Sequence, residues 1–231
     1  MGHNKKAVIA AMGAMGLFAA LVGGNASAVT MVTLAGTNVD YTFDQEDLGL
    51  FGTASVLGGS LVFMPTDFAA TSEGSPAATH LINVTVSAHT GYQLTAFNLN
   101  EEGEYSLAGE EASAYVSGYL GALDIEGNTS NYLNSNLQSS LSNGTWSASA
   151  GVTLPATGWG GADGIVSSVS LTISNDLFAD AGSGSSASIY KDFVGITAVT
   201  APVPEAETYG LLLAGLGLVG FMARRKSHAS A

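Results

Sequence analysis

The chain lacks cysteine, and the long stretch between Val29 and Val203 has a single strongly basic residue, Lys191. Without cysteine no disulfide can staple the fold, so its hydrophobic core has to be large enough to be stable by itself. The same stretch contains seventeen acidic residues, which give it a net charge of −16. A surface of this charge repels nucleic acid and anionic lipid, so we expect neither as a partner of this stretch.

The motifs of several enzyme classes are also missing. The sequence has no G-x-S-x-G segment, and phosphate-handling enzymes need basic clamps that Lys191 alone cannot supply. The two histidines of the middle stretch, His80 and His89, lie at opposite ends of a predicted strand, roughly 30 Å apart, too far to share a metal. We therefore predict a protein that is not an enzyme. A polysaccharide hydrolase with paired carboxylates is an alternative, because the distance between two such carboxylates depends on the fold and cannot be read from the sequence.

Residues 1–28 have the pattern of a secretory signal peptide. Two lysines precede the uncharged residues 7–22, and small residues at Ala26 and Ala28 form the A-x-A pattern that signal peptidase accepts. We predict cleavage between Ala28 and Val29, after export by the secretion machinery. An uncleaved membrane anchor is the alternative, but sixteen apolar residues are fewer than the ~20 that a spanning helix prefers.

Residues 29–200 show the alternation typical of β-strands. From Trp146 to Leu154 the even-numbered residues are apolar, and the odd-numbered ones are Ser, Gly or Thr. The segments Ile165–Ser174 and Ile82–Ala88 alternate in the same way. Eight to ten such strands predict one all-β domain, a β-sandwich or jelly-roll-like fold. The other expected strands are Met31–Leu34, Val39–Phe43, Leu57–Met64, Tyr92–Phe97, Ala112–Leu123 and Ile189–Val199.

Turn residues separate these strands, and one segment departs from the strand pattern. Asn143-Gly144 and the Gly/Ser run at 182–186 are typical of turns. Leucines recur every four residues at 133, 137 and 141 within an Asn/Ser-rich segment. This spacing favours a short helix across the sandwich over a polar loop with anchoring leucines.

Acidic clusters and one tryptophan are the candidate ligand contacts. Carboxylates gather at 44–47, 101–104 and 110–111, and calcium takes such ligands in loops. None has the EF-hand spacing, so we predict solvated edges and no metal or cofactor, with calcium binding as the alternative. Trp159 lies in a Gly-Trp-Gly-Gly segment that could present its ring to a sugar, or fold the ring back onto the sandwich. Trp146, with its apolar strand neighbours, is expected in the core.

Residues 201–231 combine a short polar motif, an apolar segment and a basic end. The segment Thr208–Ala223 has no charge, and as a helix it would span about 24 Å, somewhat less than the ~30 Å hydrocarbon core. Arg224, Arg225 and Lys226 follow it, and the positive-inside rule keeps them on the cytoplasmic side. We predict a C-terminal transmembrane helix, so that the precursor touches the membrane only through its two ends.

The order of these parts resembles the PEP-CTERM sorting domain of Gram-negative bacteria. The resemblance covers about twenty-five residues and rests on Val203-Pro204-Glu205, Thr208-Tyr209, the apolar run and the basic trio. Ala206 stands where the family motif has its second proline. The resemblance implies recognition by exosortase, a membrane enzyme with a catalytic cysteine, which cleaves near the motif and frees the protein from its membrane anchor.

The resemblance also implies a biological setting. Proteins with this tail accompany exopolysaccharide production and biofilm formation, so we expect a non-enzymatic protein of the cell surface or extracellular matrix. A secreted carbohydrate-binding module, calcium-assisted and using Trp159 with neighbouring acids, is the alternative. The expected organisation is a signal peptide at 1–28, a β-sandwich at 29–200 and a sorting signal at 201–231.

Overall fold

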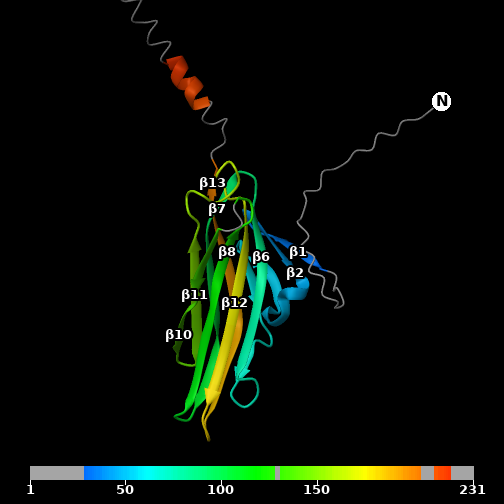
Figure 1. The fold of residues 1–231 in the computed structure, drawn as a ribbon, viewed down its shortest axis with the longest axis vertical. Helices are drawn as coiled ribbons and strands as arrows, with labels where there is room; N and C mark the ends of the chain where they lie inside the picture. Colours follow the sequence, from blue (N-terminus) through cyan, green and yellow to red (C-terminus); the bar gives the residue numbers. More distant parts are fainter. Residues whose placement is uncertain (1–28, 128–130, 204–210, 220–231) are drawn as a thin grey trace, which may run out of the picture.

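The computed structural model describes residues 29–127, 131–203 and 211–219. Two antiparallel sheets pack face to face in an elongated sandwich (Figure 1), so the predicted all-β sandwich is confirmed. The predicted signal peptide lies outside the described residues. Val29, predicted to follow the signal-peptidase cut, is 69% exposed and lies just before the first strand.

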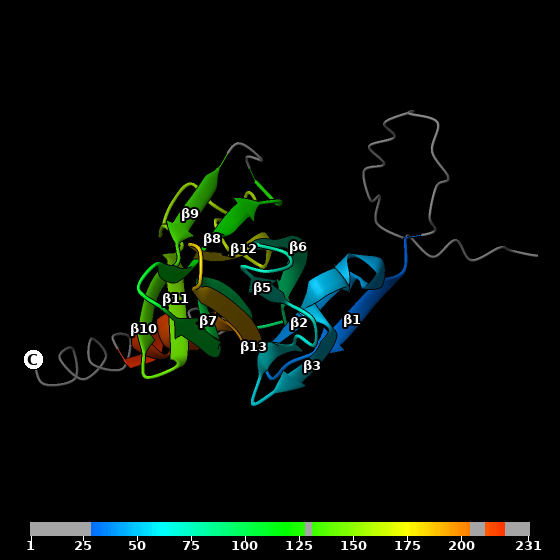
Figure 2. The same cartoon turned by 90° about the horizontal axis from the view of Figure 1, so that it is seen from below.

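The first sheet has six strands in the order β1-β2-β6-β12-β8-β9, all antiparallel. Figure 2, which looks along the length of the sandwich, shows this sheet beside the second. Its strands are Met31–Ala35 (β1), Val39–Asp44 (β2), Ala77–Ala88 (β6), Ser168–Ala181 (β12), Ala112–Asp124 (β8) and Tyr132–Asn136 (β9).

The second sheet runs in the order β10-β11-β7-β13-β4-β3, and β5 also pairs with β13. A 3₁₀ helix, Gln45–Phe51 (η1), carries the chain from the first sheet to the second. The strands are Thr53–Leu57 (β3), Ser60–Met64 (β4), Ala69–Thr71 (β5), Tyr92–Ala108 (β7), Gln138–Ser142 (β10), Thr145–Thr153 (β11) and Ser186–Pro202 (β13).

The alternation seen in the sequence becomes the core between the sheets. Strand β11 buries every second residue from Trp146 to Val152, and β12 does the same from Val169 onward. Each aliphatic side chain that is fully buried in this way stabilises the fold by about 1.5–3 kcal/mol. Together the inward faces of both sheets form one continuous cluster of apolar side chains, and this cluster takes the place of disulfides.

Two-residue turns set the register of two hairpins. Asn143 and Gly144 have φ values of 55° and 84° and join β10 to β11, the backbone that a tight hairpin turn requires. Gly58 and Gly59, with φ values of 60° and 88°, join β3 to β4 in the same way. The single strand predicted at Leu57–Met64 is therefore wrong in part, because Leu57 ends β3, Gly58 and Gly59 form the turn, and β4 begins at Ser60.

The predicted helix through Leu133, Leu137 and Leu141 is wrong. Leu133 lies in β9, an edge strand of the first sheet, and Leu141 lies in β10, an edge strand of the second sheet. A four-residue spacing is also a multiple of the two-residue strand period, so both half-buried leucines can face the interior. Leu137, between the two strands, is 9% exposed and its N–H donates to the carbonyl of Gly118 at 3.0 Å.

Residues 211–219 of the sorting segment are helical, and their leucines are 60–75% exposed. No helix within the described parts of the chain combines the length and the apolar character that crossing a membrane requires. The predicted span, Thr208–Ala223, extends outside the described residues at both ends, so the transmembrane helix stays a prediction. The sandwich itself runs two residues beyond its predicted limit at residue 200, because β13 ends at Pro202.

Candidate functional site

Three polar side chains meet in the interior of the sandwich. Glu101 comes from β7 and Lys191 from β13 of the second sheet, and Asn175 comes from β12 of the first. The Lys191 Nζ donates to Oε2 of Glu101 and to Oδ1 of Asn175. Glu101 and Asn175 are fully buried and Lys191 is 2% exposed. This buried triad therefore connects the two sheets through their apolar core.

Strand alternation places two members of the triad. Glu101 follows Leu99 on the inward face of β7, and Asn175 lies between Ile173 and Leu177 on the inward face of β12. Each polar residue thus takes a position that the strand pattern reserves for an apolar one.

A β-bulge places the third member. Ile189 and Lys191 face inward along β13, but the register with β7 shifts between Lys191 and Phe193. After the shift Val194 faces inward, so the inward positions change from odd to even numbers. The extra residue, Asp192, is exposed on the outer side. Lys191 is the last inward residue before this irregularity.

Aromatic rings enclose the amine. The Nζ of Lys191 lies 5.0 Å from the ring centroid of Phe68 and 5.4 Å from that of Trp146. The indole Nε1 of Trp146 donates to the Tyr190 carbonyl at 2.8 Å, which fixes the ring over the triad. Gly103 makes this possible, because a Cβ there would lie 2.6 Å from Nε1 and 2.0 Å from the Tyr190 oxygen. The walls around the amine are thus apolar and closely packed.

The environment favours the neutral forms of both titratable groups. Burial raises the pKa of the Glu101 carboxyl, although the neighbouring Lys191 opposes this shift. Burial likewise lowers the pKa of Lys191, against the opposing charges of Glu101 and Asp176. Two atoms of the triad, Oε1 of Glu101 and Nδ2 of Asn175, are buried without a hydrogen-bond partner among the described residues. The triad can therefore hold a free amine, a nucleophile, against an amide carbonyl.

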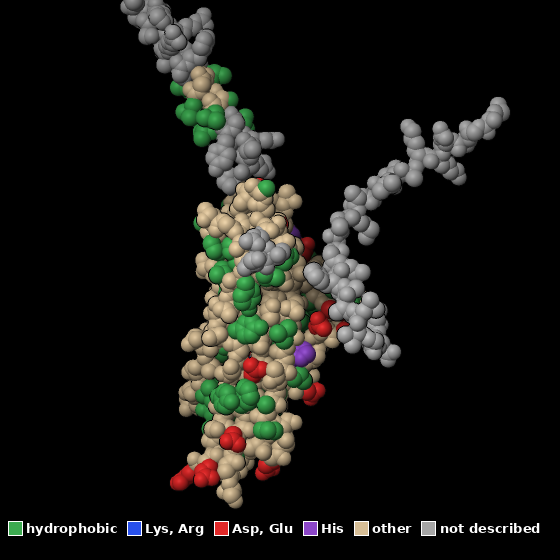
Figure 3. Space-filling view, viewed as in Figure 1, with side chains coloured by type: hydrophobic (Ala, Val, Ile, Leu, Met, Phe, Trp, Pro, Cys, Tyr) green, Lys and Arg blue, Asp and Glu red, His purple; other side chains and the backbone are tan. Residues whose placement is uncertain are grey.

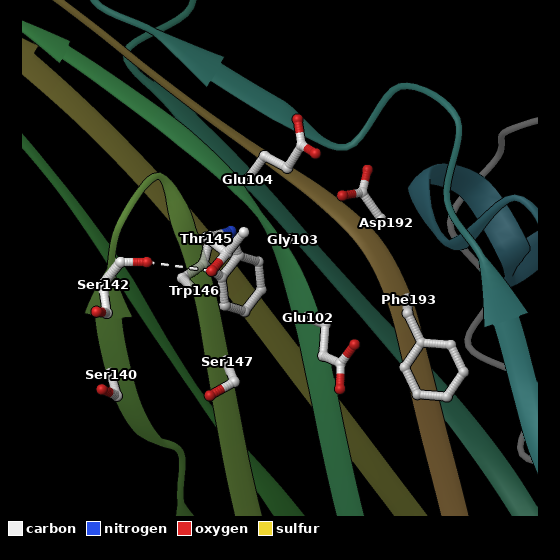
Figure 4. Close-up of a pocket in the computed structure, with 10 residues that line it drawn as sticks. All are labelled: Glu102, Gly103, Glu104, Ser140, Ser142, Thr145, Trp146, Ser147, Asp192 and Phe193. Atoms are coloured by element: carbon white, nitrogen blue, oxygen red, sulfur yellow. Dashed lines mark hydrogen bonds between the residues drawn. The ribbon is translucent and has the colours of Figure 1, made fainter.

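A second candidate site lies on the outer face of the second sheet. A depression of about 420 Å³ crosses β10, β11, β7 and β13 (Figure 4). Carboxylates of Glu102, Glu104 and Asp192 surround it, with the Phe193 ring on one side. This outer groove has hydroxyl and carboxylate groups that can bond sugar hydroxyls. Its other lining residues are Gly103, Ser140, Ser142, Thr145, Trp146 and Ser147.

A neighbouring depression extends the polar surface along the same strands. It measures about 490 Å³. Asn98 and Asn100 of β7 line it with Ser149 of β11 and Thr197 of β13. These residues share the outward parity of the groove residues on their strands, so amide and hydroxyl groups continue the hydrogen-bonding face.

A buried carboxylate orders the loops around Trp159. Asp124 accepts backbone N–H groups of Glu126 at 3.1 Å, Gly127 at 3.0 Å and Gly160 at 3.2 Å. Burial opposes ionisation of this carboxyl, but together the hydrogen bonds hold its pKa below the usual value. Trp159, next to Gly160, is only 6% exposed and belongs to the core cluster. Its ring therefore packs onto the sandwich, which is the second alternative given for Trp159, and is not presented to a sugar.

The histidines and the first acidic cluster have structural partners. His89 Nε2 lies 2.9 Å from Oδ1 of Asp40, and His80 Nε2 lies 2.9 Å from the Asp47 carbonyl. Asp44 accepts the N–H of Glu46 at 3.1 Å and so caps η1. In the ranges that the structure describes, no three His, Asp or Glu side chains are placed to hold a metal ion.

The second acidic cluster divides between the two sides of its sheet. The expectation of a solvated edge is wrong for Glu101, which faces the core, while Glu102 and Glu104 face the outer groove. The physical reason is that 101–104 continues β7 and is not a loop. Glu110 and Glu111 do lie in the loop between β7 and β8 and are exposed, as expected.

The sorting segment follows directly on the sandwich. Val203 comes after the last residue of β13, and its N–H donates to the Gly91 carbonyl at 2.8 Å. Residues 202–226 match the family model of the PEP-CTERM protein-sorting motif. The chain carries a PEP-CTERM sorting motif. A search of curated proteins found no match to the chain.

The PEP-CTERM match includes every residue predicted for sorting. These are Val203, Pro204, Glu205, Ala206, Arg224, Arg225 and Lys226; apart from Val203 they lie outside the described residues. The motif indicates an exported, membrane-anchored precursor that exosortase sorts. The matched segment starts at Pro202, so β13 and the PEP-CTERM motif share a residue.

Sequence reasoning missed the buried triad of this PEP-CTERM chain. Two signals were available. Lys191 is the only strong base between Val29 and Val203, and it continues the alternation of Ile189. Glu101 continues the alternation of Leu99. A charged residue on the apolar parity of a strand indicates a buried partner, because an isolated charge is too costly to bury.

Proposed function

We propose that this chain is a non-enzymatic protein of the cell surface or extracellular matrix whose sandwich associates with exopolysaccharide in a biofilm. The PEP-CTERM motif at 202–226 is the observation that carries the proposal. It follows β13, an inner strand of its sheet, without an intervening domain. A cut inside the motif therefore leaves all the strands of the sandwich on the released part.

The charge of the sandwich supports an extracellular role and restricts the partner. Acidic side chains are scattered over the face in Figure 3, and no Lys or Arg is visible there among the described residues. The one strong base, Lys191, is buried. A surface without exposed bases repels polyanions. The polysaccharide is therefore a neutral or cationic polymer.

The outer groove supports direct contact with such a polymer. It runs across four strands, and its carboxylates and hydroxyls face outward beside Phe193. Sugars bind through hydrogen bonds to their hydroxyls and through packing of a ring face on an aromatic side chain. The same groove supports the second candidate, a secreted carbohydrate-binding module, with Phe193 in the role that the sequence suggested for Trp159.

Binding to the polysaccharide tests the proposed role of the sandwich. Affinity electrophoresis in gels with the producing organism's exopolysaccharide should show retardation of the full chain, and Phe193→Ala should reduce it. Phe178→Ala is the matched control, because Phe178 packs on Tyr115 on the outer face of the other sheet. Equal retardation of Phe193→Ala and Phe178→Ala would contradict binding of the polysaccharide at the outer groove.

Mass spectrometry of the secreted form tests the sorting step. We expect it to lack Arg224, Arg225 and Lys226, since a cut near Pro204 removes them. A secreted form that retains these three residues would contradict exosortase processing. Turnover of the polysaccharide that is lost on changing one carboxylate would contradict the non-enzymatic role.

A further inference from the structure

We propose that Lys191 and Asn175 become joined by an intramolecular isopeptide bond inside the folded sandwich, with Glu101 as the catalytic acid–base group. The bond links the side chain of β13 in one sheet to that of β12 in the other. The inference rests on the buried triad alone and is independent of the proposed function.

The geometry places the reacting atoms together. The Nζ of Lys191 contacts Oδ1 of Asn175, and this oxygen is bonded to Cγ, the carbon that a nucleophile attacks. The same Nζ contacts Oε2 of Glu101. Three strands hold the side chains, so the fold supplies the proximity that makes an intramolecular reaction fast. All three groups are at most 2% exposed, which keeps competing water away.

The directions of the pKa shifts favour the protonation states that the reaction needs. An ammonium has no lone pair, but burial lowers the pKa of Lys191 and so favours the nucleophilic amine. Burial raises the pKa of Glu101 and favours the acid, which can donate its proton to a developing oxyanion. The phenyl ring of Phe68 and the indole of Trp146 complete an apolar enclosure around the amine.

The step balances without an oxidant or a co-reactant. The Nζ lone pair forms a bond to Cγ of Asn175, and the carbonyl electron pair moves to Oδ1, which takes the Glu101 proton. The carbonyl then re-forms, the bond from Cγ to Nδ2 breaks, and a proton that Glu101 relays from Nζ leaves with Nδ2 as ammonia. Glu101 recovers its own proton from Oδ1. An amine and a primary amide have become a secondary amide and ammonia.

A non-covalent buried ion pair explains the triad less well. Such a pair is stable only when additional hydrogen bonds satisfy its remaining polar atoms. Here Oε1 of Glu101 and Nδ2 of Asn175 have no partner within the described residues. Loss of Nδ2 as ammonia removes one of these atoms. Protonation of Glu101 removes the negative charge that would otherwise be buried with the unpaired Oε1.

Peptide mass spectrometry of the folded full chain tests the bond. Chymotrypsin cuts after Phe178 and Tyr190 and so separates the peptide of Asn175 from that of Lys191. We expect one cross-linked species, lighter than the sum of the two peptides by one ammonia, about 17 Da. Folded protein that gives the two peptides unlinked and at full mass would overturn the proposal.

Variants test the role of Glu101. Glu101→Gln keeps the amine and the amide but removes the group that moves protons, so we expect the two peptides unlinked. Glu110→Gln, an exposed change in the loop after the same strand, should leave the cross-link complete. A folded Glu101→Gln protein that still forms the link would overturn the catalytic assignment. If this variant does not fold, the wild-type digest decides by itself.

Discussion

Replacing Glu101 by Gln is expected to lower the stability of the sandwich as well as to prevent the cross-link. In the wild type the bond closes a loop between Asn175 and Lys191, which are sixteen residues apart along the chain. The variant keeps the shape of the side chain and removes only its acid–base chemistry. The unfolded variant therefore has no cross-linked loop, whereas in the unfolded wild type the loop between Asn175 and Lys191 stays closed.

The size of the effect follows from the loop length. In the chain-entropy model a cross-link that closes a loop of about fifteen residues stabilises a fold by about 3 kcal/mol. For a chain of this size, each kcal/mol corresponds to about 2–4 °C in the melting temperature. We therefore expect Glu101→Gln to melt about 6–12 °C below the wild type.

Thermal unfolding followed by circular dichroism measures this difference. Asn175→Ala also lacks the bond and should show at least the same loss, because it adds a small cavity. The exposed Glu110→Gln should melt with the wild type, and a thiol reductant should change nothing because the chain has no cysteine. An unlinked Glu101→Gln protein with the wild-type melting temperature would refute the reasoning.

Three further changes test other parts of the structure. The Asp124 carboxyl has a depressed pKa in the fold, so its ionised form stabilises the protein above the unfolded pKa of about 4. This contribution is lost as the pH falls through the lower pKa of the folded state. Asp124→Asn should therefore flatten the acid side of a plot of urea midpoint against pH. Gly103→Ala should cost about 1–3 kcal/mol in urea unfolding, because its Cβ would lie 2.0 Å from the Tyr190 carbonyl oxygen. Gly144→Ala should cost about 1–2 kcal/mol in the same assay, since φ is 84° there.

The expectations for Asp124→Asn and Gly103→Ala each have a clear contrary result. An unchanged acid limb in Asp124→Asn would mean that the loop hydrogen bonds do not stabilise the fold. Wild-type stability of Gly103→Ala would show that the Tyr190 carbonyl of β13 can move away from β7. Gly151→Ala is a matched control for the glycine changes, because its nearest neighbour would be a side-chain oxygen at 3.3 Å and its φ is ordinary.

The alternation of apolar and polar residues predicted much of the fold, because it indicates which face of each strand is buried. The alternation from Trp146 to Leu154 predicts β11 and its inward side chains almost residue by residue. The Asn143-Gly144 pair predicts the hairpin turn between β10 and β11. Both signals lie within a few residues of the structure that they determine, so no knowledge of the rest of the chain is needed.

Long-range pairing could not be predicted in the same way. Glu101 and Lys191 are ninety residues apart, and which strands become neighbours depends on the packing of the whole sandwich. The bulge at Asp192 changes the inward parity of β13, and a periodicity that is followed through it fails. The carboxylates and hydroxyls of the outer groove point outward from four strands, and only the sheet order brings them together.

The burial of Lys191 affects how the sandwich withstands its surroundings. Proteases of the trypsin class cut after Lys or Arg, and between Val29 and Val203 the chain has no other such residue. This one is 2% exposed and lies within a paired strand, where a protease cannot bind the backbone in its extended cleft. Once both basic ends are removed, the folded protein offers enzymes of this class no place to cut.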